Sequence, residues 1–523
     1  MGATTWSGYG STATPIRIRT GRAPARSTLD NAMLTRLKVD GFKNLDGIDV
    51  RFGPFTCIAG ANGVGKSNLF DAISFLAALA DRPLAEAAAA IRGTEGRVGD
   101  VRSLFRTTGG RRSSTMSFEA ELIIPETGTD DLGSPATASM TFLRYRLELR
   151  LREASSSLGP LEVAHESMVH INKQGAAAAL GFPAAQAWRE SVIRGRRSVP
   201  YIQTQEEQGK TLILTRADSE GGLGGGGPRK ALAATMPRTV LSTANNAAEH
   251  RTLVLARKEM MAWTQLQLEP TALRTPDPFN APGRVGNNGA HLPAALYALA
   301  RAEKANGLGE MIDVYQRVAN RLSELFENVR TLRVDEDQKR ELLTIVLTDL
   351  QRSEHLASAL SDGTLRFLAL AILEEHAQGP SVLCLEEPEN GIHPDRIAAM
   401  IQLVRDIAVR TDEPVGPDNP MRQVIVNTHS PGVVNAVPQD TLVVAEAVDV
   451  NRGGARERVL KLRGLKGTWR GDEDAASITP LFGYLGVAAA PPPSRRSGPA
   501  EKRLADRDDV VQLGLFAADP GGR

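Results

Sequence analysis

The sequence predicts an α/β fold with a mixed or parallel core sheet, built from two ends of the chain that enclose an antiparallel β lobe and a helical insert. Three observations predict it. A strand-like run at 48–60 leads through a glycine-rich turn into a helical pattern at 66–80. Two further apolar runs, at 381–387 and 423–428, each end in polar residues. Buried parallel strands end in this way at their carboxyl edge.

The bulk composition is that of an ordinary globular chain and excludes several classes of protein. The 523 residues carry a net charge of +1, so no overall basic field attracts nucleic acid. No apolar run is long enough to cross a bilayer, so no membrane contact is expected. Cys57 and Cys384 are too few for a disulfide framework, and we expect them to be core thiols of a cytoplasmic protein.

The chain divides into five parts. Residues 1–32 are rich in Arg, Ser, Thr and Gly, which predicts a disordered leader. Residues 33–105 should form the first half of the core, because they hold the strand-like runs, the glycine-rich turn and the helical pattern. Residues 346–487 should complete the core, and residues 488–523, rich in proline and charge, predict a disordered tail.

Residues 106–345 are expected to form the antiparallel β lobe and the helical insert. Apolar and polar residues alternate at 115–125 and 140–153, which predicts antiparallel strands with one buried face. Apolar spacing of three and four residues then predicts helices at 250–267, 292–307 and 311–329.

The glycine-rich turn GANGVGKS predicts a phosphate-binding loop, which comprises Gly60, Ala61, Asn62, Gly63, Val64, Gly65, Lys66 and Ser67. It fits the pattern G-x-x-x-x-G-K-S/T and lies between a strand and a helix, as that motif requires. Its glycines let backbone N–H groups surround one anion at the positive end of a helix. Lys66 would contact the β- and γ-phosphates, and the Ser67 hydroxyl would reach Mg²⁺.

Two carboxylates, Glu386 and Glu387, end the apolar run that begins at residue 381. The run resembles a Walker B segment, whose first acid holds Mg²⁺ through water and whose second polarises the attacking water. His429, in the segment QVIVNTHSP, follows directly after the apolar run at 423–428. A neutral imidazole at such a strand end can bind a γ-phosphate and position that water. Glu387 and His429 are therefore the predicted catalytic residues, with Ser67 and Glu386 as magnesium ligands. A solvated strand end and a structural histidine are the alternatives.

A second anion-binding turn precedes a long apolar helical pattern, at Ser361, Asp362 and Gly363. A serine hydroxyl, a glycine N–H and a helix N-terminus together favour an anion. The chain thus has two half-sites for phosphate and one phosphate loop. This pattern resembles that of the ATP-binding-cassette ATPases, and the resemblance implies a two-fold dimer whose chains complete each other's sites. An ordinary N-capped core helix is the alternative.

Four segments, at 37–73, 359–373, 383–397 and 424–434, resemble the RecF/OLD-like branch of soluble ABC-type ATPases. The likeness is to the stand-alone predicted ATPases of the AAA family, which have no Toprim domain. It implies a P-loop NTPase fold of the ABC-ATPase type with a helical lateral domain, and ATP hydrolysis with Mg²⁺ in an ATP-sandwiched homodimer. It also implies a signature in trans and a D-loop between the subunits, at Ser361, Asp362, Gly363, Asn390 and Gly391. A Q-loop glutamine could not be placed.

The expected function is ATP binding and hydrolysis in DNA repair or in defence against phages and mobile elements. The alternative is a regulatory ATP switch that senses DNA or infection and controls a separate effector nuclease or toxin. Basic segments at 193–197 and 451–471, the latter with Trp469, would contact DNA phosphates or stack on a base. A solvated basic face is the other interpretation.

The tail contains a short apolar motif, formed by Gln512, Leu513, Leu515 and Phe516. It resembles the Q-L-x-L-F pentamer by which bacterial replication and repair proteins bind the sliding clamp, a mode in which apolar anchors fill a pocket. Packing of these side chains on the protein's own core is the alternative.

Overall fold

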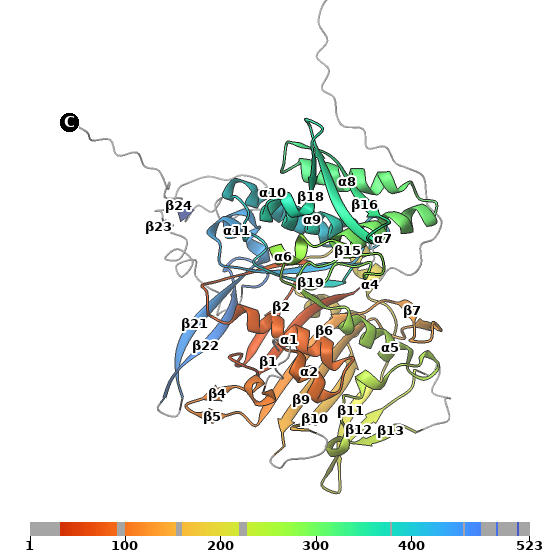
Figure 1. Cartoon of the computed structure of the whole chain (residues 1–523). Helices are drawn as coiled ribbons and strands as arrows, with labels where there is room; N and C mark the ends of the chain where they lie inside the picture. Colours follow the sequence, from red (N-terminus) through yellow and green to blue (C-terminus); the bar gives the residue numbers. More distant parts are fainter. Residues whose placement is uncertain are drawn as a thin grey trace, which may run out of the picture.

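Three large β-sheets, three two-stranded sheets and flanking helices make up the described part of the protein, seen here in a computed structural model (Figure 1). The structure describes residues 32–91, 100–152, 159–218, 227–376, 379–452 and 455–471, and two short strands at 488–489 and 510–511. The predicted leader and clamp motif (Gln512, Leu513, Leu515 and Phe516) lie outside the described residues. None of the helices in the described ranges has the length and apolarity needed to cross a membrane.

The core sheet has six strands in the order β14-β19-β20-β3-β21-β22. The first five run parallel, and β22 pairs antiparallel with β21. A mixed, largely parallel core sheet is thus confirmed, and its strands read as apolar runs because both of its faces are covered. The bounds are β3 (Phe55–Ala59), β14 (Thr264–Leu266), β19 (Val382–Glu386), β20 (Gln423–Thr428), β21 (Leu442–Arg452) and β22 (Ala455–Gly464).

The largest sheet is antiparallel, with eight strands in the order β13-β12-β11-β10-β9-β6-β1-β2. The alternating runs at 115–125 and 140–153 form the paired strands β6 and β9, as predicted. The bounds are β1 (Met33–Asp40), β2 (Ile48–Arg51), β6 (Thr115–Ile123), β9 (Phe142–Leu151), β10 (Leu161–His170), β11 (Ile202–Glu207), β12 (Lys210–Thr215) and β13 (Arg229–Leu232).

The run at 48–60, predicted as one strand, forms two strands in different sheets. β2 pairs with β1 in the antiparallel sheet, whereas β3 pairs with β20 in the core sheet. Gly53 and Pro54 separate them, and proline has no N–H to donate to a strand ladder. The first two strands of the segment 33–105 therefore belong to the antiparallel sheet, although the sequence assigned that whole segment to the core.

Helix α1 (Lys66–Leu79) packs between the two large sheets. Its Phe75 ring lies 5.7 Å from that of Phe118 on β6, and the same hydrophobic cluster includes Ile58 and Ile425 of the core sheet. Successive strand residues point to opposite faces, so Cys57 packs on the other side, against the helical lobe. Both cysteines are fully buried, as expected, and burial raises the pKa of each thiol.

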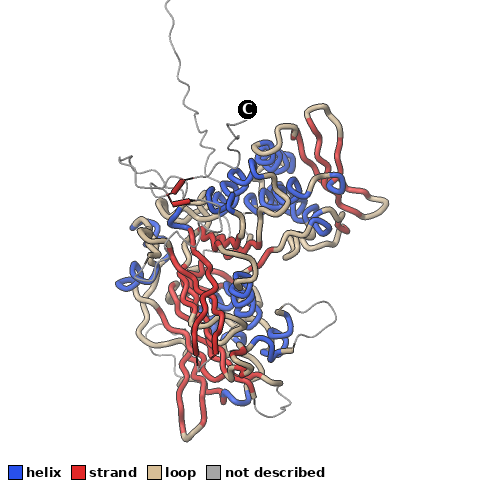
Figure 2. Tube along the Cα trace, turned by 90° about the vertical axis from the view of Figure 1, so that its left-hand side faces the viewer, coloured by secondary structure: helices blue, strands red, loops and turns tan. Residues whose placement is uncertain are grey.

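The helical lobe covers the other face of the core sheet and carries a small sheet of its own, with β15-β17-β16 in order and β18 beside β17 (Figure 2). Its elements are α7 (Leu292–Ala305), α8 (Met311–Ser323), α9 (Asp362–Glu375), α10 (Ile397–Ile407), α11 (Pro431–Ala436), β15 (Asp277–Pro278), β16 (Val329–Asp337), β17 (Leu342–Asp349) and β18 (Glu354–Leu356).

The remaining helices and strands connect these layers. They are α2 (Leu84–Ala90), α3 (Lys173–Leu180), α4 (Gln186–Val192), α5 (Ala247–Met261), α6 (Pro270–Leu273), β4 (Thr107–Thr108), β5 (Arg111–Arg112), β7 (Thr127–Thr129), β8 (Pro135–Thr137), β23 (Ala488–Ala489) and β24 (Val510–Val511). The last two pair with each other within the segment predicted as a disordered tail.

Candidate functional site

The phosphate loop joins the end of β3 to the start of α1. Gly63 and Gly65 have positive φ angles of 76° and 108°, which glycine adopts without strain. A Cβ on Gly60 would lie 2.3 Å from the Ala445 carbonyl oxygen on β21, so that position also requires glycine. These conformations turn the chain sharply between strand and helix, and the tip residues Ala61, Asn62 and Gly63 are exposed.

Lys66 begins the helix and its side chain folds back into the loop. Its Nζ donates hydrogen bonds to the carbonyl oxygens of Gly60 and Ala61, at 2.7 and 2.9 Å. Burial lowers the pKa of Lys66, while the carboxylates of Glu387, Glu389 and Glu386 act in the opposite direction. The ammonium group therefore lies near the acidic end of β19 and is held in the loop by carbonyls that a phosphate could replace.

Asn44 supports the loop from outside the motif. Its Nδ2 donates to the Val64 carbonyl oxygen at 3.0 Å, and its Oδ1 accepts from Asn68 Nδ2 at 2.8 Å. A Cβ on Gly65 would collide with this side chain. Sequence analysis did not identify Asn44, because it lies in the turn between β1 and β2 and meets the loop only through the fold.

The carboxyl ends of three parallel strands bring the remaining predicted residues together. In the ladder, Glu386 of β19 pairs with Asn427 of β20, and Thr428 pairs with Ala59 of β3. Glu387 and His429 follow directly after the two strands, and the phosphate loop follows the third. Residues from distant parts of the chain thus share one edge of the core sheet, where ligands bind in such sheets.

Glu387 is held by two side chains. His429 Nδ1 lies 2.7 Å from Glu387 Oε1, and Asn390 Nδ2 donates to Oε2 at 2.9 Å. Burial raises the pKa of Glu387, but the hydrogen bonds from Asn390 and His429 outweigh it, so that the pKa lies below its ordinary value. Its φ of 44° is unusual for a residue other than glycine. A carboxylate oriented in this way can accept a proton from water.

Gln265 is a site residue that sequence analysis missed. Its Nε2 donates to Glu386 Oε1 at 3.1 Å, and its Oε1 accepts from the Ser74 hydroxyl on α1 at 2.8 Å. The helix predicted at 250–267 ends instead at Met261, and Gln265 lies on β14, the edge strand beside β19. A cavity of about 450 Å³ adjoins this edge and is lined by Gln265, Glu386 and Ser74, among others.

The oxygen donors at this edge fit a magnesium ion bound together with phosphates. The Ser67 hydroxyl, the Glu386 carboxylate and the Gln265 amide are hard donors of the kind Mg²⁺ prefers. Among the described residues no group of three or more His, Cys, Asp or Glu side chains could hold a metal alone. A few protein ligands completed by water and substrate phosphate are typical of Mg²⁺ sites.

The predicted signature turn caps α9. The exposed Ser361 accepts a hydrogen bond from the Thr364 N–H at 3.2 Å, and Asp362 pairs with Arg274. In the described chain no hydrogen bond or ion pair joins residues 361–363 to the chain's own phosphate loop. Gly363 instead packs on the loop that follows Glu387: a Cβ there would lie 2.8 Å from the Gly391 carbonyl oxygen.

Trp469 contacts side chains of its own chain. Its ring packs edge-on against Phe182 with centroids 6.0 Å apart, and the Arg470 guanidinium lies 4.0 Å from its centroid. Arg470 itself donates to the Thr56 hydroxyl at 2.8 Å. The end of the basic segment 451–471 therefore packs against the protein itself, because Trp469 contacts Phe182 and Arg470 bonds to Thr56 near the start of β3.

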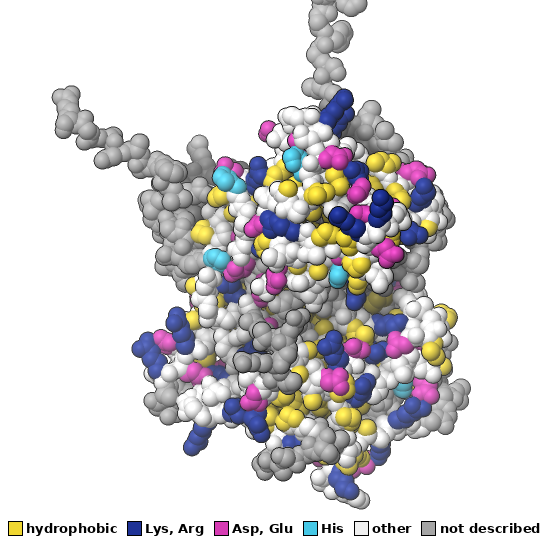
Figure 3. Space-filling model, viewed as in Figure 1, with side chains coloured by type: hydrophobic (Ala, Val, Ile, Leu, Met, Phe, Trp, Pro, Cys, Tyr) yellow, Lys and Arg dark blue, Asp and Glu magenta, His cyan; other side chains and the backbone are white. Residues whose placement is uncertain are grey.

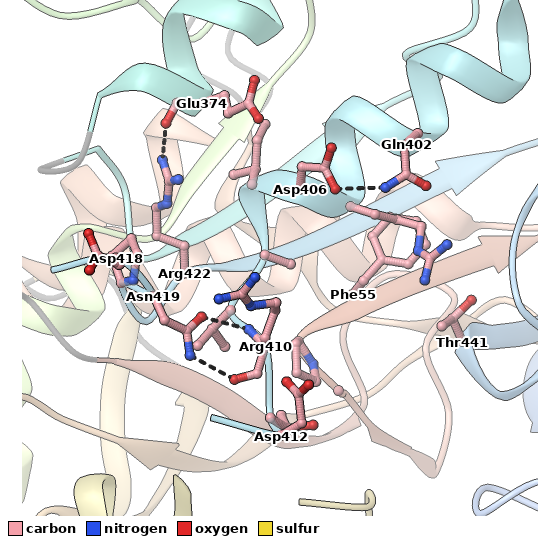
Figure 4. A pocket seen from close by; sticks show the side chains of 18 of the residues that line it. Phe55, Glu374, Gln402, Asp406, Arg410, Asp412, Asp418, Asn419, Arg422 and Thr441 are labelled. Atoms are coloured by element: carbon pink, nitrogen blue, oxygen red, sulfur yellow. Dashed lines mark hydrogen bonds between the residues drawn. The ribbon is translucent and has the colours of Figure 1, made fainter. Parts of the chain in front are cut away.

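A cavity of about 1120 Å³ lies away from these residues. It is lined by the ends of α8, α9 and α10 and by Phe55, where β3 begins (Figure 4). Its charged groups bond to one another and to backbone: Arg422 donates to the Glu374 carbonyl oxygen, and Gln402 donates to Asp406. Since β3 begins there and the phosphate loop follows its other end, this cavity belongs to the opposite edge of the sheet.

A protein family described as "AAA domain, putative AbiEii toxin, Type IV TA system" matches residues 55–123 and 269–435, a little under half of the chain. These two segments contain the phosphate loop, the signature turn, the paired carboxylates and His429. With the geometry above, the match supports an ATPase domain of the AAA/ABC type. No curated protein matches the sequence.

The solved structures that are distantly similar to this chain include three Smc head domains. One is the SmcHead bound to the C-winged helix domain of ScpA, with 14% identity, a TM-score of 0.42 and coverage of 82% of this chain and 98% of that one. Another is the Smc head domain with an extended coiled coil bound to the C-terminal domain of ScpA, from Pyrococcus furiosus (12%, 0.39, 82% and 96%). The third is the SMC head domain from Thermotoga maritima (12%, 0.32, 83% and 99%).

Proposed function

We propose that this chain is a cytoplasmic ABC-type ATPase of the RecF/OLD-like branch, which hydrolyses ATP in a nucleotide-sandwiched homodimer and acts in DNA repair or in defence. One observation carries the proposal: Glu387, oriented by His429 and Asn390, lies at the same sheet edge as Lys66. A phosphate anchor and an ionised carboxylate at one edge are the parts that phosphoryl transfer to water requires.

The residues of the site divide the work. The loop at 60–67 binds the phosphates, and Lys66 exchanges its two carbonyl contacts for β- and γ-phosphate oxygens. Glu387 orients a water molecule and accepts its proton, because its lowered pKa keeps it ionised. Ser67, Glu386 and Gln265 would hold Mg²⁺, which when bound neutralises charge on the phosphates.

The exposed cap of α9 supports a role for the signature turn in trans. Ser361 faces solvent at a helix N-terminus, and no hydrogen bond joins it to the chain's own phosphate loop within the described residues. A phosphate of a second chain's nucleotide would find a hydroxyl and free N–H groups there. Asn390 and Gly391 are exposed beside it and would form the D-loop contact between chains.

The test is the mass of Glu387→Gln in solution, with and without Mg·ATP. We expect the mass to double with ATP, because the substitution keeps the shape of the side chain and removes the proton acceptor. Ser361→Arg in the same background should prevent the doubling, whereas Glu327→Gln, a change at an exposed carboxylate outside the site, should hydrolyse ATP normally. A mass that ignores ATP although ATP binds would overturn the dimer.

Basic side chains on one end of the molecule support DNA as the ligand. The exposed Arg111 and Arg112 lie on β5, and the exposed Arg458 lies on β22. Glu457 of β22 accepts a hydrogen bond from Thr108 of β4 at 2.8 Å, which joins the β4–β5 hairpin to β22. Figure 3 shows Lys and Arg side chains at the lower left of this face, where these hairpins lie. Such a surface can neutralise backbone phosphates.

Duplex DNA should therefore bind the wild-type chain at low salt and raise its ATPase rate. Arg111→Glu with Arg112→Glu should weaken binding and reduce its salt dependence, since each lost phosphate contact lowers the slope by about one. Arg301→Glu with Lys339→Glu makes the same charge change on exposed parts of the helical lobe and should leave binding intact. An equal loss of DNA binding in both variants would indicate a general charge effect and would contradict the assignment of this surface to DNA binding.

A regulatory switch is the second candidate, and the description of the matched family favours it, because that description names a toxin and a toxin–antitoxin system. In this case slow ATP turnover would control a separate effector nuclease or toxin. A partner protein should then co-purify with Glu387→Gln in the presence of ATP, and DNA should not raise the ATPase rate.

Binding to a sliding clamp is a separate proposal for the tail. A pulldown with purified clamp should succeed for the full chain and fail for Leu515→Ala with Phe516→Ala, because these side chains would be the apolar anchors. Ala517 follows the motif directly and is not one of the anchors, so Ala517→Ser serves as the neutral control. No capture of the full chain would remove the proposal.

A further inference from the structure

Two charged side chains beside the signature turn lack the partners that their burial requires. Glu389 is 6% exposed; its Oε1 accepts a hydrogen bond from the Thr428 hydroxyl, while its Oε2 is buried with no partner. Arg366 on α9 is half-buried, and its Nε is also buried without a hydrogen bond. The described residues therefore leave a carboxylate oxygen and a guanidinium N–H unsatisfied, which costs free energy in each case.

The two groups flank one tight junction. Arg366 lies one helical turn after Asp362, on the same side of α9. Burial lowers the pKa of Arg366, while the carboxylates of Asp362 and Glu389 act in the opposite direction. Gly363 of α9 packs directly on Gly391, whose chain segment begins at Glu387. A movement of α9 therefore acts on the loop that positions the catalytic carboxylate.

We propose that Arg366 and Glu389 pair when two chains close on ATP, and that this pair couples the two ATP sites of the dimer. The inference rests on the proposed function. In such a dimer Ser361 serves the partner's nucleotide, whereas Glu387 acts on the nucleotide of its own chain. Arg366 is on the helix that Ser361 caps, and Glu389 is two residues from Glu387. The pair thus links Ser361, which serves the partner's nucleotide, to Glu387, which acts on the nucleotide of its own chain.

The physical reason is that pairing would give hydrogen-bond partners to two buried polar atoms at once. A buried carboxylate oxygen and a buried guanidinium N–H without partners are each unfavourable, and bringing Glu389 Oε2 and Arg366 Nε together satisfies both. Phosphate bound at the Ser361 cap would shift α9 far enough for Arg366 to reach Glu389. Nucleotide in the partner's site would then favour the conformation of Glu387 that is oriented for catalysis in the chain's own site. Such a link between two binding events appears as positive cooperativity.

The experiment compares ATP hydrolysis over a range of ATP concentrations for wild type, Arg366→Met, Glu389→Gln and the double variant. The wild type should be cooperative, with a Hill coefficient approaching about 2, the limit for two sites. Each single variant should lower the coefficient toward about 1, and the double variant should be no worse than either single one, because the residues act as a pair. Arg366→Lys keeps the charge and should retain part of the cooperativity.

A second measurement separates this role from a static structural contact. Without nucleotide the pair is not formed and the buried Nε of Arg366 has no partner, so Arg366→Met should unfold at the same urea concentration as wild type or at a higher one. The control Arg301→Met, a change at an exposed arginine on α7, should unfold at the wild-type concentration. Lower stability of Arg366→Met without ATP would overturn the proposal, as would unchanged cooperativity in the variants or a non-cooperative wild type. Failure of Glu387→Gln to dimerise would instead overturn the proposed function.

Discussion

The side-chain amide of Gln265 donates a hydrogen bond to the Glu386 carboxylate, with 3.1 Å between Nε2 and Oε1. Gln265 also accepts a hydrogen bond from Ser74 of α1, so it ties the helix after the phosphate loop to the acidic end of β19. This bridge connects the loop that would bind phosphate with the carboxylate that would bind magnesium.

Replacing Gln265 should therefore impair the use of magnesium. Gln265→Leu leaves Glu386 and Ser74 without their partner, and we expect the ATPase rate to fall by about tenfold or more, as for other residues that orient metal ligands. The rate should be measured at several Mg²⁺ concentrations, and the loss should be largest at low Mg²⁺. Gln267→Leu alters an exposed residue that lines the same cavity and is the matched control. Equal effects of the two would contradict the assignment.

His429 should matter for turnover and little for nucleotide affinity. Its hydrogen bond to Glu387 orients the carboxylate, so His429→Ala should lower kcat by about two orders of magnitude, the usual range for a residue of an acid–base pair. Binding of a fluorescent ATP analogue should change by less than about threefold, since this hydrogen bond holds the Glu387 carboxylate and not the phosphate loop. A loss confined to nucleotide affinity would show that His429 is a binding residue only.

Gly60 should be required for stability as well as for nucleotide binding. A Cβ there would meet the Ala445 carbonyl oxygen at 2.3 Å, and backbone on a neighbouring strand cannot move aside cheaply. Gly60→Ala should lower the free energy of unfolding by about 1–3 kcal/mol, as overpacking does in close-packed sites. Gly416→Ala adds the same methyl group where nothing lies within 4 Å and is the control in urea unfolding. Equal stability of the two variants would contradict the prediction.

Glu166 should make the folded protein less stable as the pH rises. This carboxyl is fully buried on β10 and bonds to the N–H groups of Val240 and Leu241, at 2.7 and 2.9 Å. Burial raises its pKa to about 7, although those hydrogen bonds act in the opposite direction. The folded state thus holds its proton more tightly than the unfolded state. The stability contributed is complete below the ordinary pKa of 4.5 and is lost as the pH passes through about 7.

The measurement is urea unfolding of wild type and Glu166→Gln between pH 5 and pH 8. The free energy of unfolding of wild type should fall relative to that of the variant, by up to about 3 kcal/mol, because one pKa unit corresponds to about 1.4 kcal/mol. Glu166→Gln should be less stable at low pH, since its amide group faces a backbone N–H. Parallel pH profiles for the two proteins would show that Glu166 does not titrate in this range.

Local patterns were enough to predict the parts of the site that follow directly from strands. The phosphate loop needs glycine at positions of positive φ, a lysine and a hydroxyl in fixed order, and all of these are consecutive in the chain. Glu387 and His429 were predictable because apolar strands run into them, and the carboxyl ends of parallel strands meet at one edge. The α/β class followed from the same strands.

Pairing between distant strands decided the rest. Gly53 and Pro54 divide one apparent strand between two sheets, and the buried amide of Gln423 joins those sheets by bonding to the Leu34 N–H and the Gly53 carbonyl oxygen. Neither the division of the strand nor the hydrogen bonds of Gln423 leaves a periodic pattern of apolar residues in the sequence. Gln265 was predicted to lie at the end of a helix, because the sequence pattern there does not distinguish a last helical turn from a short edge strand.

The sequence by itself therefore determined the chemistry that each end of the core can offer: an anion-binding loop, a pair of carboxylates, a histidine and a capped helix. Only the tertiary structure decided which of them touch. It placed His429 and Asn390 on Glu387, Asn44 beneath the phosphate loop, and Gly363 against Gly391. The reason is that local conformation depends on neighbouring residues, whereas these contacts depend on strand order and on the packing of α9, which no short segment encodes.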